Sequence, residues 1–575
     1  MYLNDHDLAQ GDALNRLEAG LYRGQIGRRA FIKAALAAGV SLAATHALAD
    51  AGEMAAISQL YNRQNLKGSY DYIVVGAGSG GAVVAGRLAA AGAEVLLLEA
   101  GGSDQVDAVL KPGMWPSNIR SERDWGFTAD PSSDVNGRAL ILPMGRAVGG
   151  GSSVNATVWA RGHKGDFDHW ADESGDPAWS YENVLKIYRR IENWRGAEDA
   201  VRRGKNGRLW IEPAQDPAAI APAMLAAANS VGIPTFDDMN GAMMEGDGGA
   251  AIANLRIKNG QRRNIPADYL YGELSKPNIT LLTGAEVMGL GFEGTTARAV
   301  KFRKDGQNHT VSAKRIVLSA GALNTPKLLM LSGIGDPDEL ARHGIKTLVK
   351  SMGVGRNFQD HVLVAGCIWE YKDALPPRNN LAEATFFWKS DASLDRPDLQ
   401  PFQIEVPYAS EVTSTKFPVV PGAWTIAPGL VKPKSRGRVT LRSANPLDLV
   451  QVDGGFLRHP DDMKALLVGI ELCREIGNSA PMRAYVKREI MPGNLGKAEM
   501  TSFIRDAAGT YFHESCTCKM GTDEMSVVDA SLNVRGIEGL TIADASVMPQ
   551  VSTGNTMAPT VIIGERAADI LLGVT

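Results

Sequence analysis

The clearest pattern of hydrophobic and polar positions lies between residues 70 and 102. A short β-branched and apolar run, Tyr72–Val75, predicts a buried parallel strand. Residues Ala82–Ala91 are rich in Ala, Val and Leu with a single Arg, which predicts a helix. A second apolar run, Val95–Leu98, predicts another buried strand. The pattern therefore predicts a strand–helix–strand unit.

Three glycines, Gly76, Gly78 and Gly81, join the first strand to the helix in the order G-x-G-x-x-G. The first turns the chain, the second lets the backbone approach a pyrophosphate, and the third lets the helix pack on the strand. The helix N-terminus then faces the phosphates. Glu99 ends the second strand, where an acid binds ribose hydroxyls and disfavours NADP. The unit is typical of dinucleotide binding, and it leaves FAD and NAD both open.

Other segments predict a second lobe beside this unit. The stretch "SYENVLKIYRRIENW" has helical spacing, "RGRVTLRS" is typical of a strand, and "DDMKALLVGIELCREIG" predicts an amphipathic helix. Near the C-terminus, "APTVIIGERAADILL" predicts a closing helix with Pro559 in its first turn, and the N-terminus of such a helix stabilises negative charge on a bound group.

Composition limits the number of lobes and the class of partner but does not indicate a function. A chain of 575 residues is too long for one core, which predicts two or more lobes. Hydrophobic residues at 44%, charged residues at 22% and a net charge of −4 give no sign of a nucleic-acid partner. Four cysteines, Cys367, Cys473, Cys516 and Cys518, are too few for a disulfide framework.

The N-terminus is typical of a bacterial twin-arginine export signal. Arg28 and Arg29 precede an apolar run, Ala34–Ala49, which ends in the small-x-small cleavage pattern Ala47–Ala49. That run is too short and too rich in alanine for a good membrane span, and no other segment is expected to be transmembrane. The alternative is an amphipathic helix with incidental arginines. Export predicts delivery of the folded protein to the periplasm.

Five later blocks together resemble a known family. These blocks are "GRAVGGGSSVNATVWARGHKGDFDHW", "GALNTPKLLMLSGIG", "VGRNFQDH", "HESCTCKMG" and "LTIADASVMPQVSTGNTMAPTVIIGERAADIL". From about Tyr70 to the end the chain resembles the glucose–methanol–choline oxidoreductases, which use FAD. The resemblance resolves the dinucleotide as FAD. It implies an α/β fold with a Rossmann-like FAD-binding domain, similar to p-hydroxybenzoate hydroxylase, and an α+β substrate domain built on an antiparallel sheet.

The resemblance also implies how the chain is divided between domains. The expected intervals are an export signal at 1–49, a linker at 50–68, the FAD-binding domain at 69–165, 254–368 and 502–575, and the substrate domain at 166–253 and 369–501. The last FAD-binding interval carries the active-site residues.

The glycine turn at residues 76–81, the glycine loop at residues 149–151 and the segments that follow them carry the expected cofactor contacts. By resemblance, Asn155 and Ala156 lie against the flavin ring, Val287 beside the adenine, Ala320 near the adenosine, and Asp544 and Ala545 near the pyrophosphate and flavin. For Val287 and Ala320, an ordinary core role is the alternative. The full expected set is Gly76, Gly78, Ser79, Gly81, Glu99, Gly149, Gly150, Ser152, Asn155, Ala156, Val287, Ala320, Asp544, Ala545, Asn555 and Thr556. Val154 stands where some relatives carry a flavin-linked histidine, so FAD is expected to be non-covalent.

Two residues near the C-terminus are the expected catalytic pair. His513 matches the family's base position, and an imidazole titrates near neutral pH. Asn555 stands where other members have a second histidine, and its amide can position the substrate oxygen but cannot accept a proton at neutral pH. With Cys516 and Cys518, His513 resembles a partial metal site, but a closed zinc site needs a fourth ligand. We expect no metal.

The sequence therefore predicts a flavoenzyme that oxidises the CH–OH group of a small-molecule alcohol, sugar or polyol by base-assisted hydride transfer to flavin N5. Alternatives are a non-oxidative flavoenzyme of the same fold, such as a hydroxynitrile lyase or a photodecarboxylase, and an idle flavin-binding subunit. Export next to the respiratory chain favours a dehydrogenase that uses a quinone or cytochrome over an oxidase.

Overall fold

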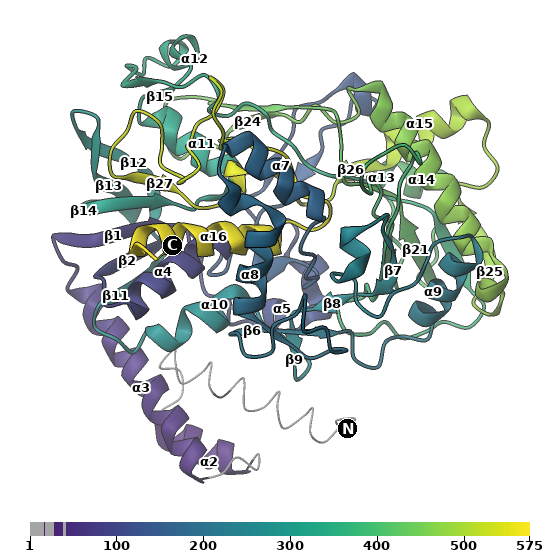
Figure 1. Ribbon diagram of the computed structural model, residues 1–575, viewed down its shortest axis with the longest axis horizontal. Coiled ribbons are helices and arrows are strands. Elements are labelled where there is room, and N and C mark those ends of the chain that lie inside the picture. Colours follow the sequence, from purple (N-terminus) through teal and green to yellow (C-terminus); the bar gives the residue numbers. More distant parts are fainter. Residues whose placement is uncertain (1–16, 18–27, 38–41, 575) are drawn as a thin grey trace.

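A computed structural model describes residues 17, 28–37 and 42–574 (Figure 1). Its first sheet has seven strands, in the order β11 (Ile279–Thr283), β2 (Val95–Glu99), β1 (Ser69–Val75), β14 (Gln307–Leu318), β13 (Thr296–Lys304) and β12 (Glu286–Glu293), with β27 (Leu540–Ile542) beside β14. The pairs that β1 forms with β2 and β14 are parallel, as are β11 with β2 and β14 with β27. This arrangement contains the predicted strand–helix–strand unit.

The helix of that unit, α4 (Ser79–Ala90), begins three residues before the predicted start at Ala82. Its first turn contains two glycines at positions where nearby backbone leaves no room for a side chain. A Cβ on Gly80 would lie 2.0 Å from the Ala543 carbonyl oxygen, and one on Gly81 would lie 2.0 Å from that of Gly76. The helix α16 (Met557–Leu572) packs beside α4, as Figure 1 shows.

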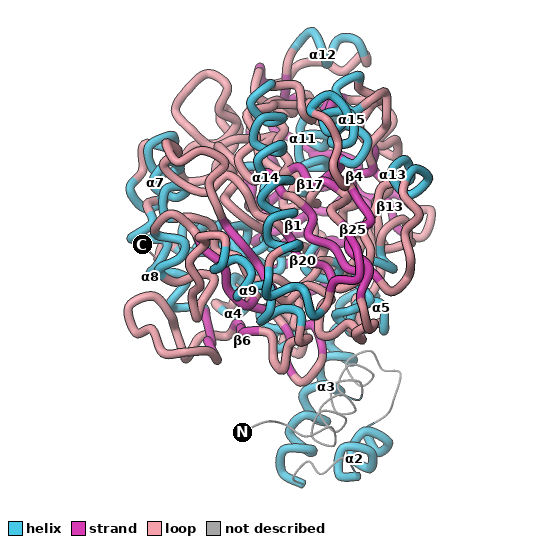
Figure 2. Tube along the Cα trace, turned by 90° about the vertical axis from the view of Figure 1, so that its right-hand side faces the viewer, coloured by secondary structure: helices cyan, strands magenta, loops and turns pink. Residues whose placement is uncertain are grey.

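The second sheet is antiparallel and has six strands. Their order is β25 (Val486–Met491), β18 (Ile368–Tyr371), β21 (Ala423–Ala427), β20 (Phe402–Ile404), β19 (Ala384–Phe387) and β7 (Gly249–Ile252). The helices α9 (Ile220–Ser230) and α14 (Pro460–Asn478) contact strands of this sheet (Figure 2). Residues of its two faces fall into two separate hydrophobic clusters, one shared with α9 and α14 and one that contains Phe402 and Ile404.

Each sheet draws its strands from separate parts of the chain. The strands of the first sheet all lie within the intervals 69–165, 254–368 and 502–575. Those of the second lie within 166–253 and 369–501, except that β18 begins at Ile368. The predicted helices near residues 181 and 461 correspond to α8 (Tyr181–Ile191) and α14, and the predicted strand "RGRVTLRS" contains β23 (Arg438–Thr440).

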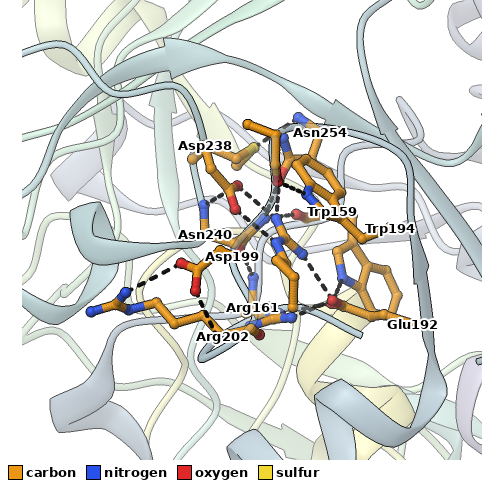
Figure 3. A network of polar contacts seen from close by, with 12 residues as sticks. Trp159, Arg161, Glu192, Trp194, Asp199, Arg202, Asp238, Asn240 and Asn254 are labelled. Atoms are coloured by element: carbon orange, nitrogen blue, oxygen red, sulfur yellow. Dashed lines mark hydrogen bonds and ion pairs between the residues drawn. The ribbon is translucent and has the colours of Figure 1, made fainter. Parts of the chain in front are cut away.

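A buried polar network holds the segment that follows the glycine loop (Figure 3). Glu192 accepts from Trp159 Nε1 at 2.8 Å and from Arg161 Nε at 2.7 Å, and it pairs with Arg203 at 3.0 Å. Burial would raise the pKa of Glu192, but the charges of Arg161 and Arg203 hold that pKa below its ordinary value. Because the network bonds both Trp159 and Arg161, it fixes the chain a few residues beyond Asn155.

Two helices cover the second half of the expected export signal. The helix α2 (Arg28–Ala37) starts at the arginine pair, and α3 (Leu42–Gln64) contains the expected cleavage motif Ala47–Ala49. Apart from Leu17, the part of the expected signal that precedes Arg28 lies outside the described residues. The apolar run of the signal is thus largely helical where the structure describes it.

The far end of α3 covers the edge strand β11. Gln59 Nε2 donates to the Ile279 carbonyl at 2.9 Å and its Oε1 accepts from Leu281 N at 2.9 Å. Asn62 Nδ2 also donates to the Ile279 carbonyl, at 3.0 Å. The interval 50–68, expected as a linker, is therefore helical as far as Gln64 and bonded to the first sheet. Within the described ranges, no helix is both long enough and apolar enough to cross a membrane.

Candidate active site

A cavity lies at the carboxyl ends of β1 and β2 and extends to the loop that carries His513. This is the position where parallel α/β sheets bind ligands. Of the residues predicted for the site, those that line the cavity are Gly76, Gly78, Ser79, Glu99, Gly150, Asn155, Ala156, Val287, Ala320, His513, Asp544, Ala545, Asn555 and Thr556. Gly81, Gly149 and Ser152 do not line it. The fold thus brings together residues from all three FAD-binding intervals.

The glycine turn between β1 and α4 fits a dinucleotide. An ideal Cβ on Gly78 would have only the Gly150 Cα near it, at 4.0 Å, so that side of Gly78 faces the cavity. Gly78 is the N-cap of α4 and provides no side-chain cap for the helix. Backbone N–H groups of the first helical turn therefore remain available to a phosphate group. Any side chain at Gly78 would fill the space that a pyrophosphate needs.

Glu99 lies at the end of β2, on the cavity wall. Its two carboxylate oxygens accept from Ala77 N at 2.9 Å and from Gly101 N at 2.7 Å. Burial raises the pKa of Glu99 to about 7, although both hydrogen bonds act in the opposite direction. The carboxyl group therefore lies beside the glycine turn, where the prediction requires an acceptor for ribose hydroxyls.

The glycine loop supports the cavity from behind as well as lining it. Gly149 has φ of +93°, and a Cβ there would lie 2.1 Å from Ser153 Oγ. Ser152 Oγ donates to the Gly149 carbonyl at 2.7 Å and accepts from Ile265 N at 3.2 Å. Gly149 and Ser152 thus fix the loop's shape, while Val154 and Asn155 face the cavity.

Arg262 supports Asn155 and was missed by the sequence analysis. Its Nη1 donates to Asn155 Oδ1 at 2.9 Å, and its Nε donates to the Val109 carbonyl at 2.7 Å. Both partners are neutral, and burial lowers the pKa of Arg262 to about 9. No motif marked this arginine, because its contact with Asn155 depends on how two distant segments pack.

Asp544 and the start of α16 close the other side of the cavity. Asp544 accepts from Gly321 N at 2.9 Å and from Thr325 Oγ1 at 2.6 Å, which joins it to the segment after β14. Asn555, Thr556 and Met557 line the cavity at the N-terminus of α16. The positive end of the α16 dipole therefore faces the cavity, where it stabilises negative charge.

His513 forms a hydrogen bond at each ring nitrogen. Its Nδ1 lies 2.8 Å from Nδ1 of His361, and its Nε2 lies 3.1 Å from Nδ2 of Asn555. Gln400 Nε2 donates to Asn555 Oδ1 at 3.1 Å, which turns the Asn555 NH₂ group towards His513. This orientation of the Asn555 amide assigns Nε2 of His513 as the unprotonated nitrogen, and Nδ1 then carries the proton that His361 accepts.

The protonation state of His513 suits a base. Burial lowers the pKa of His513 to about 3, so the imidazole is neutral at neutral pH. Burial, and then the neighbouring His513, also lower the pKa of His361 well below its ordinary value. A neutral ring with an unprotonated Nε2 can accept a hydroxyl proton.

His361 and Gln400 are further residues that the sequence analysis missed. His361 ends the block "VGRNFQDH", so the signal was present, but the block gave no reason to place its last side chain beside His513. Gln400 lies in a stretch without a motif. Both are fully buried and act on the predicted catalytic pair.

Two acids flank the backbone of the His513 segment. Asp360 accepts from His513 N at 3.0 Å, and burial raises its pKa to about 7. Glu514 lines the cavity, and neither of its carboxyl oxygens has a hydrogen-bond partner within the described part of the chain. Burial, and then the charge of Asp360, raise the pKa of Glu514 well above its ordinary value. Glu514 therefore holds its proton more tightly than an ordinary carboxyl group does.

The cysteines near His513 are buried thiols. Burial raises the pKa of Cys516 to about 12 and holds the pKa of Cys518 above its ordinary range. Both thiols are therefore protonated at neutral pH. Among the described residues, no three His, Cys, Asp or Glu side chains are placed to hold a metal ion.

Comparisons with known proteins agree with this geometry. Models of the GMC oxidoreductase family match residues 70–363 and 433–564. A GMC-type oxidoreductase of Mycobacterium tuberculosis is 37% identical, covering 87% of this chain and 99% of that protein. An alcohol dehydrogenase [acceptor] of Pseudomonas putida is 34% identical, covering 88% and 96%.

Solved structures show the same fold. Pyridoxine 4-oxidase from Mesorbium loti superposes with a TM-score of 0.83 at 31% identity, covering 87% of this chain and 98% of that one. Formate oxidase of Aspergillus oryzae, whose structure was described for its FAD modification, has a TM-score of 0.80 at 26% identity, covering 88% and 98%.

The dinucleotide cavity and the His–Asn pair at its end define a flavin-dependent oxidoreductase. The chain belongs to the GMC oxidoreductase family, and its cofactor is FAD. Its relatives support alcohol oxidation in general. The predicted fold class is confirmed: a mixed α/β protein with an antiparallel second sheet.

Proposed function

We propose that this protein oxidises the CH–OH group of a small-molecule alcohol, with His513 as the base and Asn555 as the residue that positions the substrate oxygen. The observation that carries the proposal is the neutral His513, whose unprotonated Nε2 lies 3.1 Å from the Asn555 amide in the FAD cavity. FAD, when bound, accepts the hydride from the carbinol carbon.

The two side chains divide the remaining work. His513 Nε2 takes the hydroxyl proton, which raises the electron density on the carbinol oxygen. The Asn555 NH₂ group donates a hydrogen bond to that oxygen and holds it near His513. Gln400 keeps the amide in this orientation through its bond to Asn555 Oδ1.

Anaerobic addition of alcohols to the purified holoenzyme tests the proposal. Loss of the oxidised flavin absorbance, with formation of the matching aldehyde or ketone, is the expected result. The His513→Ala variant should reduce its flavin about 10²–10⁴-fold more slowly, the usual worth of a positioned base. A wild-type rate in that variant would show that His513 is not the base.

The cofactor and acceptor proposals have separate tests. Val154 lines the cavity and cannot link to flavin, so acid or heat should release FAD from the polypeptide. For the acceptor, we propose a quinone or a cytochrome. Reoxidation of the reduced flavin by air at the turnover rate would instead show an oxidase.

We also propose export to the periplasm. Cleavage after Ala49 would leave intact the bonds that Gln59 and Asn62 make to β11, so the mature protein keeps this edge covered. The Arg28→Lys, Arg29→Lys double variant should remain in the cytoplasm on cell fractionation. Unchanged periplasmic delivery would contradict the proposal.

A further inference from the structure

The part of the cavity next to His513 has an aromatic and aliphatic wall. The Tyr511 ring stacks on the His513 ring, with centroids 4.9 Å apart and an interplanar angle of 28°. The Phe402 ring centroid lies 5.7 Å from that of Tyr511. Leu363, Phe402, Ile404 and Tyr511 belong to one hydrophobic cluster, and all four line the cavity. The base therefore lies at the edge of an apolar surface.

The strand β20 explains why this wall is apolar. Side chains alternate across a strand, so Phe402 and Ile404 point to one face and Gln403 to the other. Gln403 Oε1 accepts from Glu383 N at 2.8 Å and from Ala384 N at 3.1 Å, away from the cavity. Gln403 thus forms its hydrogen bonds within the sheet, and Phe402 and Ile404 face the cavity.

We propose that the site takes an alcohol whose carbinol carbon bears an aromatic ring or an alkyl chain, with aromatic alcohols preferred. This inference rests on the proposed function and narrows it. The carbinol group occupies the polar edge formed by His513 and Asn555, and the body of the substrate packs on Phe402, Ile404 and Tyr511. Rings gain from offset or edge contacts with this wall.

Sugars and polyols fit this wall poorly. Each substrate hydroxyl buried against the wall without a partner lowers affinity by about 5- to 150-fold. The Tyr408 hydroxyl and the Glu514 carboxyl, which also line the cavity, can accommodate a further polar substituent.

Anaerobic stopped-flow reduction of the holoenzyme tests the inference. Benzyl alcohol, 1-hexanol, glycerol and glucose are compared by the ratio of the limiting reduction rate to the apparent Kd. The ratio for benzyl alcohol should exceed those for glycerol and glucose at least about 100-fold. An equal or higher ratio for either of those two would overturn the inference while leaving the proposed function intact.

Binding of a compound that cannot react separates the two proposals. Benzyl methyl ether should perturb the flavin spectrum in a saturable way, and glycerol should not. If the ether binds and no alcohol reduces the flavin, the apolar site stands and the proposed function fails. If neither the ether nor any alcohol has an effect, the inference is overturned as well.

A matched pair of variants locates the site. Phe402→Leu should raise the apparent Kd for benzyl alcohol about 3- to 10-fold, since it removes an aromatic contact worth roughly that factor. Phe386→Leu makes the same change on the neighbouring strand β19, but Phe386 belongs to the cluster on the opposite face of the sheet. Phe386→Leu should leave unchanged the order in which the substrates rank by the ratio of reduction rate to apparent Kd. Equal effects of the two substitutions would mean that Phe402 does not contact the substrate.

Discussion

His361 offers the sharpest test of how the catalytic base is prepared. Its Nδ1 accepts the proton that His513 carries on Nδ1, at 2.8 Å, and this bond leaves Nε2 of His513 unprotonated and able to act as the base. Replacing His361 by Leu removes the acceptor. The buried Nδ1–H of His513 then has no partner, and the ring is free to move its proton to Nε2, where it blocks proton abstraction.

The size of the effect follows from the lost bond. A buried donor left unsatisfied costs about 1–3 kcal/mol. That range corresponds to about 5- to 150-fold slower flavin reduction. His361→Gln should recover most of the rate, because its amide oxygen can accept the same proton.

The assay is anaerobic flavin reduction, read together with FAD content and thermal unfolding of each variant. If His361 acts through His513, then adding His361→Leu to the His513→Ala variant should slow flavin reduction almost no further. A wild-type rate in His361→Leu would refute this reasoning. If the fold decreases in reduction rate of the two single variants multiply in the double variant, then His361 has a role that is independent of His513.

Three further predictions concern neighbouring features. Asn555→Ala should slow flavin reduction less than His513→Ala does, and Asn555→His should keep measurable activity; equal losses in both alanine variants would remove the distinction between base and positioning residue. Glu192→Gln should lower the free energy of unfolding in urea by about 3–5 kcal/mol, because Arg161 and Arg203 lose their shared counter-charge. Burial, and then Glu383, raise the pKa of Glu405 from 4.5 to about 9, so its stabilising effect is complete below pH 4.5 and is lost as the pH rises towards 9. Urea unfolding is measured at a series of pH values for the wild type and for Glu405→Gln. The free energy of unfolding of the variant should increase relative to that of the wild type as the pH rises from 4.5 to about 9. A difference that stays constant with pH would contradict the raised pKa of Glu405.

The sequence by itself predicted the glycine turn of the cofactor cavity and the candidate pair His513 and Asn555. Gly76, Gly78 and Glu99 belong to a short strand–helix–strand unit, whose geometry is set by nearby backbone and is therefore visible in the residue order. His513 and Asn555 stood in recognisable blocks, and the structure places both on the same cavity. The substrate wall had no such motif.

Only the tertiary structure decided how these residues are supported. His361 and His513 are 152 positions apart, and Gln400 and Asn555 are 155 apart, so nothing local in the sequence pairs them. Gly81, Gly149 and Ser152 are predicted ligand contacts, and the structure does not place them on the cavity lining. The physical reason is that hydrogen-bond partners, burial and pKa values depend on which segments the two sheets bring together, and short-range sequence patterns record only what a segment does by itself.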